Sequence, residues 1–125
     1  MKIYVAALYS TKDTEATLAK RVIEGAGHEC TSQWITGGED GRSRSEAAIM
    51  DLNDVWRADA LILLTLPLGT LYKGGGRCVE FGYALGLGKK VAVVGDYENI
   101  FCHLPSVKVC STVGAAIEFL EVDHD

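Results

Sequence analysis

The sequence predicts an α/β protein with a doubly wound parallel sheet of about five strands in the order 2-1-3-4-5, covered by helices on both faces in three layers. Short apolar segments alternate with amphipathic ones along the chain, which is typical of consecutive βαβ units. The segment "DALILLTL" (59–66) is almost continuously apolar, as expected of a parallel strand that is buried on both faces. A chain of 125 residues suits one domain, spanning residues 1–125.

Five segments are expected to form the strands of this sheet. In chain order they are "KIYVAAL" (2–8), "HECTSQWI" (28–35), "DALILLTL" (59–66), "KKVAVVG" (89–95) and "SVKVCS" (106–111). The helices between and after them are expected at 15–27, 46–58, 77–88 and 113–122. Thr14 or Asp13 should cap the first helix and Thr112 the last, while Gly25 and Gly27 should end the first.

Helical spacing gives each of the first two helices an apolar stripe. The apolar positions of the first helix are Leu18, Val22 and Ile23, and those of the second are Ile49, Leu52, Val55 and Trp56. Between the second strand and the second helix, "TGGEDGRSRSE" is the most loop-like part of the chain.

Composition and charge exclude several classes of function. The net charge is −5 and no basic stripe is present, so a nucleic-acid polymer is not an expected partner. The four cysteines (30, 78, 102 and 110) have no CxxC spacing and no histidine pairs with them, which indicates reduced thiols in a cytoplasmic protein and no metal site. The apolar runs are too short for a signal peptide or a membrane span, so no membrane association is expected.

Glu80 is the first candidate for chemistry. Sheets of this kind bind ligands beyond the carboxyl ends of their strands, which points to the loops at 8–13, 67–76 and 96–105. Glu80 follows the second of these loops and lies near a helix start, where a carboxylate also has a purely structural use. Gly74, Gly75 and Gly76 precede it and allow backbone N–H groups to approach a ligand. Their spacing matches neither a P-loop nor a GxGxxG site, so it does not by itself identify a phosphate.

Four other side chains have both a structural and a functional interpretation. Spacing alone favours a solvated helix face for Asp51. Tyr4 fits the core, although a tyrosine on the first strand can reach a carboxylate that follows the third. Arg77 is either an anion contact or a helix-surface residue, and His103 is either a crevice residue or a solvated loop residue.

Three segments resemble the nucleoside 2-deoxyribosyltransferase family, which includes deoxynucleoside 5′-monophosphate N-glycosidases. They are "KIYVAA", "DLNDVWRADALILL" and "GGGRCVEFGYALGLGKKV", and the similarity extends over nearly the whole chain. The resemblance implies a flavodoxin-like fold, subunit association, no cofactor and cleavage of an N-glycosidic bond. It assigns the active site to Tyr4, Asp51 and Glu80.

The chemistry of these three side chains agrees with that assignment. Glu80 can attack or stabilise C1′ of a sugar that departs through an oxocarbenium-like state. Asp51 can protonate the leaving base if its pKa is raised, and Tyr4 can hold Glu80 in place. Transfer of the sugar to another base and transfer to water both remain open. The alternatives are a non-catalytic nucleotide-binding module and, more weakly, a flavin-binding protein.

The sugar end of the substrate is expected at the glycine-rich turn. Relatives often carry Asp or Ser six residues before the glutamate, where this chain has Gly74. Donors therefore dominate the predicted subsite, which favours a 5′-monophosphate over a free nucleoside. The predicted substrate-binding residues are Ser10, Gly74, Gly75, Gly76, Arg77, Asn99 and His103. A neighbouring subunit is expected to close the shallow crevice through the helices around Leu52, Val55 and Trp56 or around Phe81 and Leu85, giving a dimer or a larger homo-oligomer.

Overall fold

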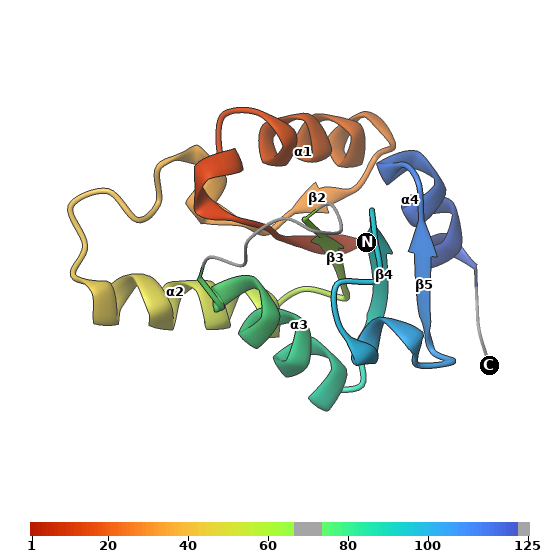
Figure 1. Ribbon diagram of the computed structural model, residues 1–125. Helices are drawn as coiled ribbons and strands as arrows, with labels where there is room; N and C mark the ends of the chain where they lie inside the picture. The colour runs from red at the N-terminus through yellow and green to blue at the C-terminus, as the bar shows by residue number, and fades with distance from the viewer. Residues whose placement is uncertain (67–73, 123–125) are drawn as a thin grey trace.

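The computed structural model describes residues 1–66 and 74–122, and shows the predicted five-stranded parallel sheet in the order β2-β1-β3-β4-β5 (Figure 1). Part of the predicted loop at 67–76, namely residues 67–73, lies outside the described residues. The strands are β1 (Lys2–Ala6), β2 (Glu29–Cys30), β3 (Ala60–Leu64), β4 (Lys90–Val94) and β5 (Val107–Cys110). The predicted fold class is therefore confirmed.

Helices cover both faces of this sheet (Figure 1). The α-helices are α1 (Glu15–Gly25), α2 (Arg44–Trp56), α3 (Gly76–Gly86) and α4 (Val113–Glu121), and three short 3-10 helices are η1 (Tyr9–Thr11), η2 (Gln33–Thr36) and η3 (Ile100–His103). Helices α1 and α4 contact each other on one face, and α2 and α3 contact each other on the other. Thr112 caps α4 as predicted, since its hydroxyl accepts a hydrogen bond from the Ala115 N–H at 3.1 Å.

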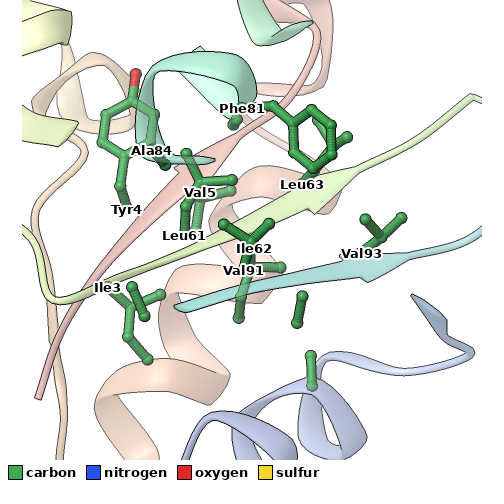
Figure 2. Close-up of a cluster of buried hydrophobic side chains, with 14 of the residues drawn as sticks. Ile3, Tyr4, Val5, Leu61, Ile62, Leu63, Phe81, Ala84, Val91 and Val93 are labelled. Atoms are coloured by element: carbon green, nitrogen blue, oxygen red, sulfur yellow. The ribbon is translucent and has the colours of Figure 1, made fainter. Parts of the chain in front are cut away.

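Strand register determines which side chains share a face of the sheet. Tyr4, Leu61 and Val91 are neighbours across β1, β3 and β4, and the pleat directs them to the same side. Figure 2 shows the Tyr4 ring rising from its strand beside Ala84 of α3, with the hydroxyl at the outer end of the ring. Phe81 of α3 packs in the same buried cluster. The face under α3 therefore holds an apolar core with one phenol at its margin.

The second strand is much shorter than the predicted 28–35. Its ladder with β1 ends at Cys30, and the following residues turn into η2. The reason lies in two side chains that occupy the edge of β1 in place of a strand. The Ser32 hydroxyl accepts from the Val5 N–H at 2.7 Å, and the Trp34 indole N–H donates to the Val5 carbonyl at 3.0 Å. Because these two side chains satisfy the N–H and carbonyl groups of Val5, the backbone after Cys30 can leave the sheet without leaving those groups unbonded.

The apolar stripes of α1 and α2 are only partly buried. On α1, Ile23 is buried, but Leu18 is 57% exposed and Val22 is 43% exposed. The small residues Ala16 and Ala19 face the sheet instead, and they let the helix approach the strands closely.

On α2, Val55 is buried together with Met50, as helical periodicity allows. The other residues of the predicted apolar stripe point outward: Ile49 is 58% exposed, Leu52 is 37% exposed and Trp56 is 62% exposed. The apolar stripe of α2 is thus a surface of the monomer. None of the described helices is long and apolar enough to cross a membrane.

Candidate active site

A cavity of about 460 Å³ opens at the carboxyl end of β1, and its volume lies in the range of small-molecule sites. Residues 7–10 after β1 form one wall, and the start of α3 forms another through Gly74, Gly76, Arg77 and Glu80. Trp34, Glu39 and Asp51 complete the lining. The cavity therefore lies at the switch in strand order, between β1 and β3, where the sequence predicted the crevice.

Tyr4 and Glu80 meet at this cavity. The Tyr4 hydroxyl donates a hydrogen bond to Oε2 of Glu80 at 2.6 Å. Burial raises the pKa of Glu80 to about 7, against the opposing effect of the Tyr4 hydrogen bond, and the charges of Glu39 and Asp54 raise it further. Burial and the neighbouring Glu80 carboxylate raise the pKa of Tyr4 well above its ordinary value. The phenol therefore remains a donor that fixes the Glu80 carboxylate.

The pKa of the Asp51 carboxyl group is raised above neutrality. Burial raises its pKa to about 8, helped by a hydrogen bond with the Glu39 carboxyl and by the negative charge of Glu80. Its Oδ1 atom is buried and meets no hydrogen-bond partner among residues 1–66 and 74–122. Asp51 is half-buried and lines the cavity, so it does not lie on the solvated helix face that its spacing favours.

The loop before α2 brings Glu39 to Asp51. Gly37 ends η2 in the left-handed conformation, with φ of 83°. A Cβ on Gly38 would lie 2.7 Å from the Gln33 carbonyl oxygen, so only glycine permits this close turn. The chain then places Glu39 at the cavity and reaches α2 at Ser43, whose side chain accepts from the Glu46 N–H in a capping box.

A buried carboxylate anchors η2 to α2 beneath this loop. Asp54 is 1% exposed and accepts from the backbone N–H of Gln33 at 3.1 Å and from its side-chain amide at 2.9 Å. It also accepts from Nε of Arg57 at 3.0 Å. These bonds hold the η2 segment, and with it the cavity wall formed by Trp34, against the helix that carries Asp51.

Arg77 lies under the glycine-rich turn and is not a helix-surface residue. Its side chain is 1% exposed and forms an ion pair with Glu98, which is 11% exposed. Its Nη1 atom also donates to the Gly74 carbonyl at 3.3 Å. Glu98 accepts from the Leu66 N–H at 3.3 Å, so this carboxylate joins the end of β3 to the start of α3. Arg77 is among the residues that line the cavity, but Glu98 already offsets its charge.

The other predicted substrate-binding residues divide into two groups. Ser10, Gly74 and Gly76 line the cavity, and Gly75 is the N-cap of α3 beside them. Gly74 has φ of 68°, so a side chain there would strain the turn, which explains why the position carries no Asp or Ser. Asn99 and His103 are not among the lining residues: Asn99 caps η3, and the His103 ring stacks on Tyr97 with 4.3 Å between ring centroids.

Glu39, Glu98 and Trp34 were not singled out from the sequence, although two of them line the cavity and the third holds Arg77. The glycine pair before Glu39 was the only local signal for its position. No group of three or more histidine, cysteine or acidic side chains in the described part of the chain could hold a metal ion. The cavity thus offers a held carboxylate, a protonated carboxyl and a flat indole, which suits acid-assisted displacement at carbon.

Comparison with known proteins gives a match in structure only. No protein-family model matches the sequence, and no curated protein matches it either. Among solved structures, the CMP N-glycosidase BcmB of Clostridium botulinum matches with a TM-score of 0.69 and 15% sequence identity. The match covers 97% of this chain and 98% of that one. At this identity the likeness shows that the two chains share a fold.

Proposed function

We propose that the protein cleaves the N-glycosidic bond of a nucleoside or a nucleoside 5′-monophosphate. The observation that carries this proposal is the Glu80 carboxylate, fixed by Tyr4 and facing the same cavity as the protonated Asp51. The fold is shared with a protein described as a CMP N-glycosidase, which adds support but does not by itself establish function.

The reaction uses the two carboxyl groups in different protonation states. The ionised Glu80 attacks C1′, the C1′–N bond breaks, and its electron pair passes to the base nitrogen as Asp51 delivers a proton. The glycosyl ester on Glu80 is then displaced by water, giving the free sugar, or by a second base, giving a new nucleoside. Tyr4 is a positioning residue, because it acts on the substrate only through Glu80.

Two donors are proposed for the 5′ end of the sugar: the Ser10 hydroxyl and the backbone N–H groups at the start of α3. Arg77 contributes less charge than an unpaired arginine would, because Glu98 neutralises it. Both a 5′-hydroxyl and a 5′-phosphate therefore remain candidates for this subsite, with Asn99 and His103 able to contribute only from a neighbouring subunit or after a loop movement.

The proposed assembly is a homodimer or a larger homo-oligomer. Its support is the apolar outer stripe of α2, formed by Ile49, Leu52 and Trp56, together with Val79 of α3, which is 62% exposed. These two helices pack against each other on the face of the sheet that carries the cavity. A second subunit on this surface would bury the stripe close to the site.

The test of the proposed function is base release from a panel of deoxynucleosides, ribonucleosides and their 5′-monophosphates, followed by chromatography. Release that requires Glu80 supports the proposal. Saturable binding of the same compounds without release supports a nucleotide-binding module instead. Adding a second free base separates the two enzyme types, since a transferase forms a new nucleoside and a hydrolase does not.

A further inference from the structure

The start of α3 indicates where the 5′ end of the sugar would lie. Gly76 and Glu80 are separated by about one helical turn, so they share a face of α3, and both line the cavity. The rise of the helix between them is about 6 Å. That length is close to the separation between C1′ and the phosphorus of a 5′-phosphate in a nucleotide. With C1′ at Glu80, a 5′-phosphate therefore reaches the first turn of α3.

The loop after β1 forms the second wall of the cavity, and its backbone is held in place. The Lys12 N–H donates to the Tyr9 carbonyl at 3.0 Å. The Lys12 carbonyl accepts from the Thr17 hydroxyl at 2.6 Å, which ties the loop to the first turn of α1. Ser10 lies between these bonds and lines the cavity. The segment that carries Ser10 and Lys12 is therefore positioned before a ligand enters.

Lys12 brings a positive charge to the mouth of the cavity. Its ammonium lies 5.9 Å from the centroid of the Tyr9 ring, within the range of a cation–π contact. Tyr9 lines the cavity and is 53% exposed, so its ring borders both the cavity and the solvent. Among residues 1–66 and 74–122, no carboxylate forms an ion pair with Lys12. Because an exposed cation–π contact is weak, the ammonium can leave the ring for a stronger partner.

Arg77 is less suited than Lys12 to bind an anion. Its guanidinium already forms an ion pair with Glu98 and donates to the Gly74 carbonyl. An anion that binds Arg77 would have to compete with the Glu98 carboxylate. The cavity also holds the Glu80 carboxyl group, so a phosphate dianion needs a nearby cation to offset the repulsion.

We propose that Lys12 binds the 5′-phosphate of the substrate and makes the protein select nucleoside 5′-monophosphates over free nucleosides. This inference rests on the proposed function and names its substrate class. The ammonium leaves the Tyr9 ring and donates to the phosphate, while the Ser10 hydroxyl and the backbone N–H groups at the start of α3 donate to its other oxygens. A free nucleoside places a neutral hydroxyl there, and a hydrogen bond from the ammonium to this hydroxyl is weaker.

The experiment compares each deoxynucleoside and ribonucleoside of the panel above with its own 5′-monophosphate, using wild type, Lys12→Met and Lys12→Arg. We expect wild type to favour the monophosphates by at least about tenfold in kcat/KM, because a hydrogen bond between two charged groups contributes that much. Lys12→Met keeps the apolar stem without the charge and should lower the monophosphate-to-nucleoside ratio about tenfold. Lys12→Arg keeps the charge and should keep most of the ratio.

The matched control is Lys108→Met. It removes an exposed lysine from β5, at the edge of the sheet, and should leave the ratio unchanged. The melting temperature of each variant checks the fold. Calorimetric titration of the same pairs into Glu80→Gln, with and without Lys12→Met, measures binding without turnover.

The outcomes separate this inference from the proposed function. Tighter binding of the monophosphates that Lys12→Met removes would uphold phosphate recognition even if no base were ever released, and the proposed catalysis alone would then fail. Base release that requires Glu80 but shows equal kcat/KM for both members of each pair would overturn the inference and leave the catalysis standing. A preference for monophosphates that Lys12→Met does not change, or failure of every monophosphate to bind, would overturn it as well.

Discussion

The Tyr4 hydroxyl donates to Oε2 of Glu80 at 2.6 Å, although 76 positions separate the two residues in the sequence. The first strand and the third helix meet here because the sheet places β1 beside β3, and α3 follows β3. A phenol whose pKa is raised keeps its proton and remains a donor throughout the physiological range. The carboxylate that it holds is therefore oriented before any substrate enters.

Replacing Glu80 by Gln should abolish turnover and leave the fold intact. The amide keeps the shape of the side chain but cannot form a glycosyl ester, so base release should fall by at least about a thousandfold. Circular dichroism and the melting temperature check the fold. Glu118→Gln, which removes an exposed carboxylate from α4, is the matched control. A Glu80→Gln protein that retains wild-type release would exclude Glu80 as the nucleophile.

Tyr4→Phe should move the acidic limb of the pH–rate profile upward. Activity requires ionised Glu80 and protonated Asp51, so wild type should show a narrow bell with apparent pKa values near 7 and 8 that belong to the coupled pair. The Tyr4 hydrogen bond lowers the pKa of Glu80, and its loss should raise the lower value and reduce kcat by about 10- to 100-fold. An unshifted profile in Tyr4→Phe would contradict the positioning role.

The site should make the protein less stable as the pH rises. Asp51 and Glu80 have folded-state pKa values near 8 and 7, above their ordinary values, so between about pH 4 and 8 the folded state binds more protons than the unfolded state. The stability that these two protonated groups contribute is fully present below about pH 4 and is lost progressively until the pH has passed 7 and 8. Asp51→Asn should melt a few degrees above wild type at pH 9 and show no such gain at pH 5. Equal melting temperatures at pH 9 would count against the raised pKa.

Breaking the Arg77–Glu98 ion pair should mainly lower the free energy of unfolding, with a smaller effect on which substrate the protein prefers. Glu98→Gln removes the carboxylate that pairs with the buried Arg77 guanidinium, which costs about 3 kcal/mol and lowers the melting temperature by ~10 °C. The control is Glu24→Gln, which breaks the exposed Lys20–Glu24 pair and should cost less than about 0.5 kcal/mol.

The Arg77–Glu98 ion pair also affects how the 5′ group of the substrate would be held. With Glu98 present, Arg77→Ala should reduce kcat/KM for a deoxynucleoside and for its 5′-monophosphate by similar factors, because it loosens the turn for both. A loss confined to the monophosphate would instead identify Arg77 as a phosphate contact, despite its partner. Refolding yield and melting temperature must accompany these rates, since the side chain is buried.

Trp56→Glu should convert the proposed oligomer into monomers. Trp56 is 62% exposed on the outer stripe of α2, and a charge there would have to be buried in the interface. Sedimentation velocity at micromolar concentration measures the change. Leu18→Glu is the control, because Leu18 is 57% exposed on α1, on the opposite face of the sheet. A wild-type protein that is monomeric and fully active would contradict the proposed subunit association.

The sheet and its strand order could be predicted because apolar strands and intervening helices leave strong local patterns. The candidate roles of Tyr4 and Glu80 follow from the rule that places ligands at the carboxyl ends of strands, combined with the family resemblance. Glu39 could not be predicted, since its position depends on the left-handed turn at Gly37 and on the anchoring of Gln33 by Asp54. These are contacts between residues far apart in the sequence, and no local pattern encodes them.

The partial burial of the apolar stripes on α1 and α2 has one physical reason. Helical periodicity finds apolar stripes, but it does not say whether a stripe faces the sheet or another surface. On α1 the sheet-facing positions are alanines, which carry little hydrophobic signal, whereas the larger Leu18 points outward. On α2 the stripe residue Trp56 is exposed, at a position where the sequence suggests a subunit contact.

The Ser32 hydroxyl that accepts from the Val5 N–H also shields the molecule from self-association through its strands. Within residues 1–66 and 74–122, no strand pairs with that side of β1 beyond Cys30, and an open strand edge is a template for aggregation. Ser32 and Trp34 occupy both polar groups of Val5, so an incoming chain finds no free ladder position there. Ser32 and Trp34, which end β2 early, therefore also keep this edge of β1, beside the cavity, closed to fibril-like pairing. Ser32→Ala would free the Val5 N–H, one of the two polar groups, for such pairing.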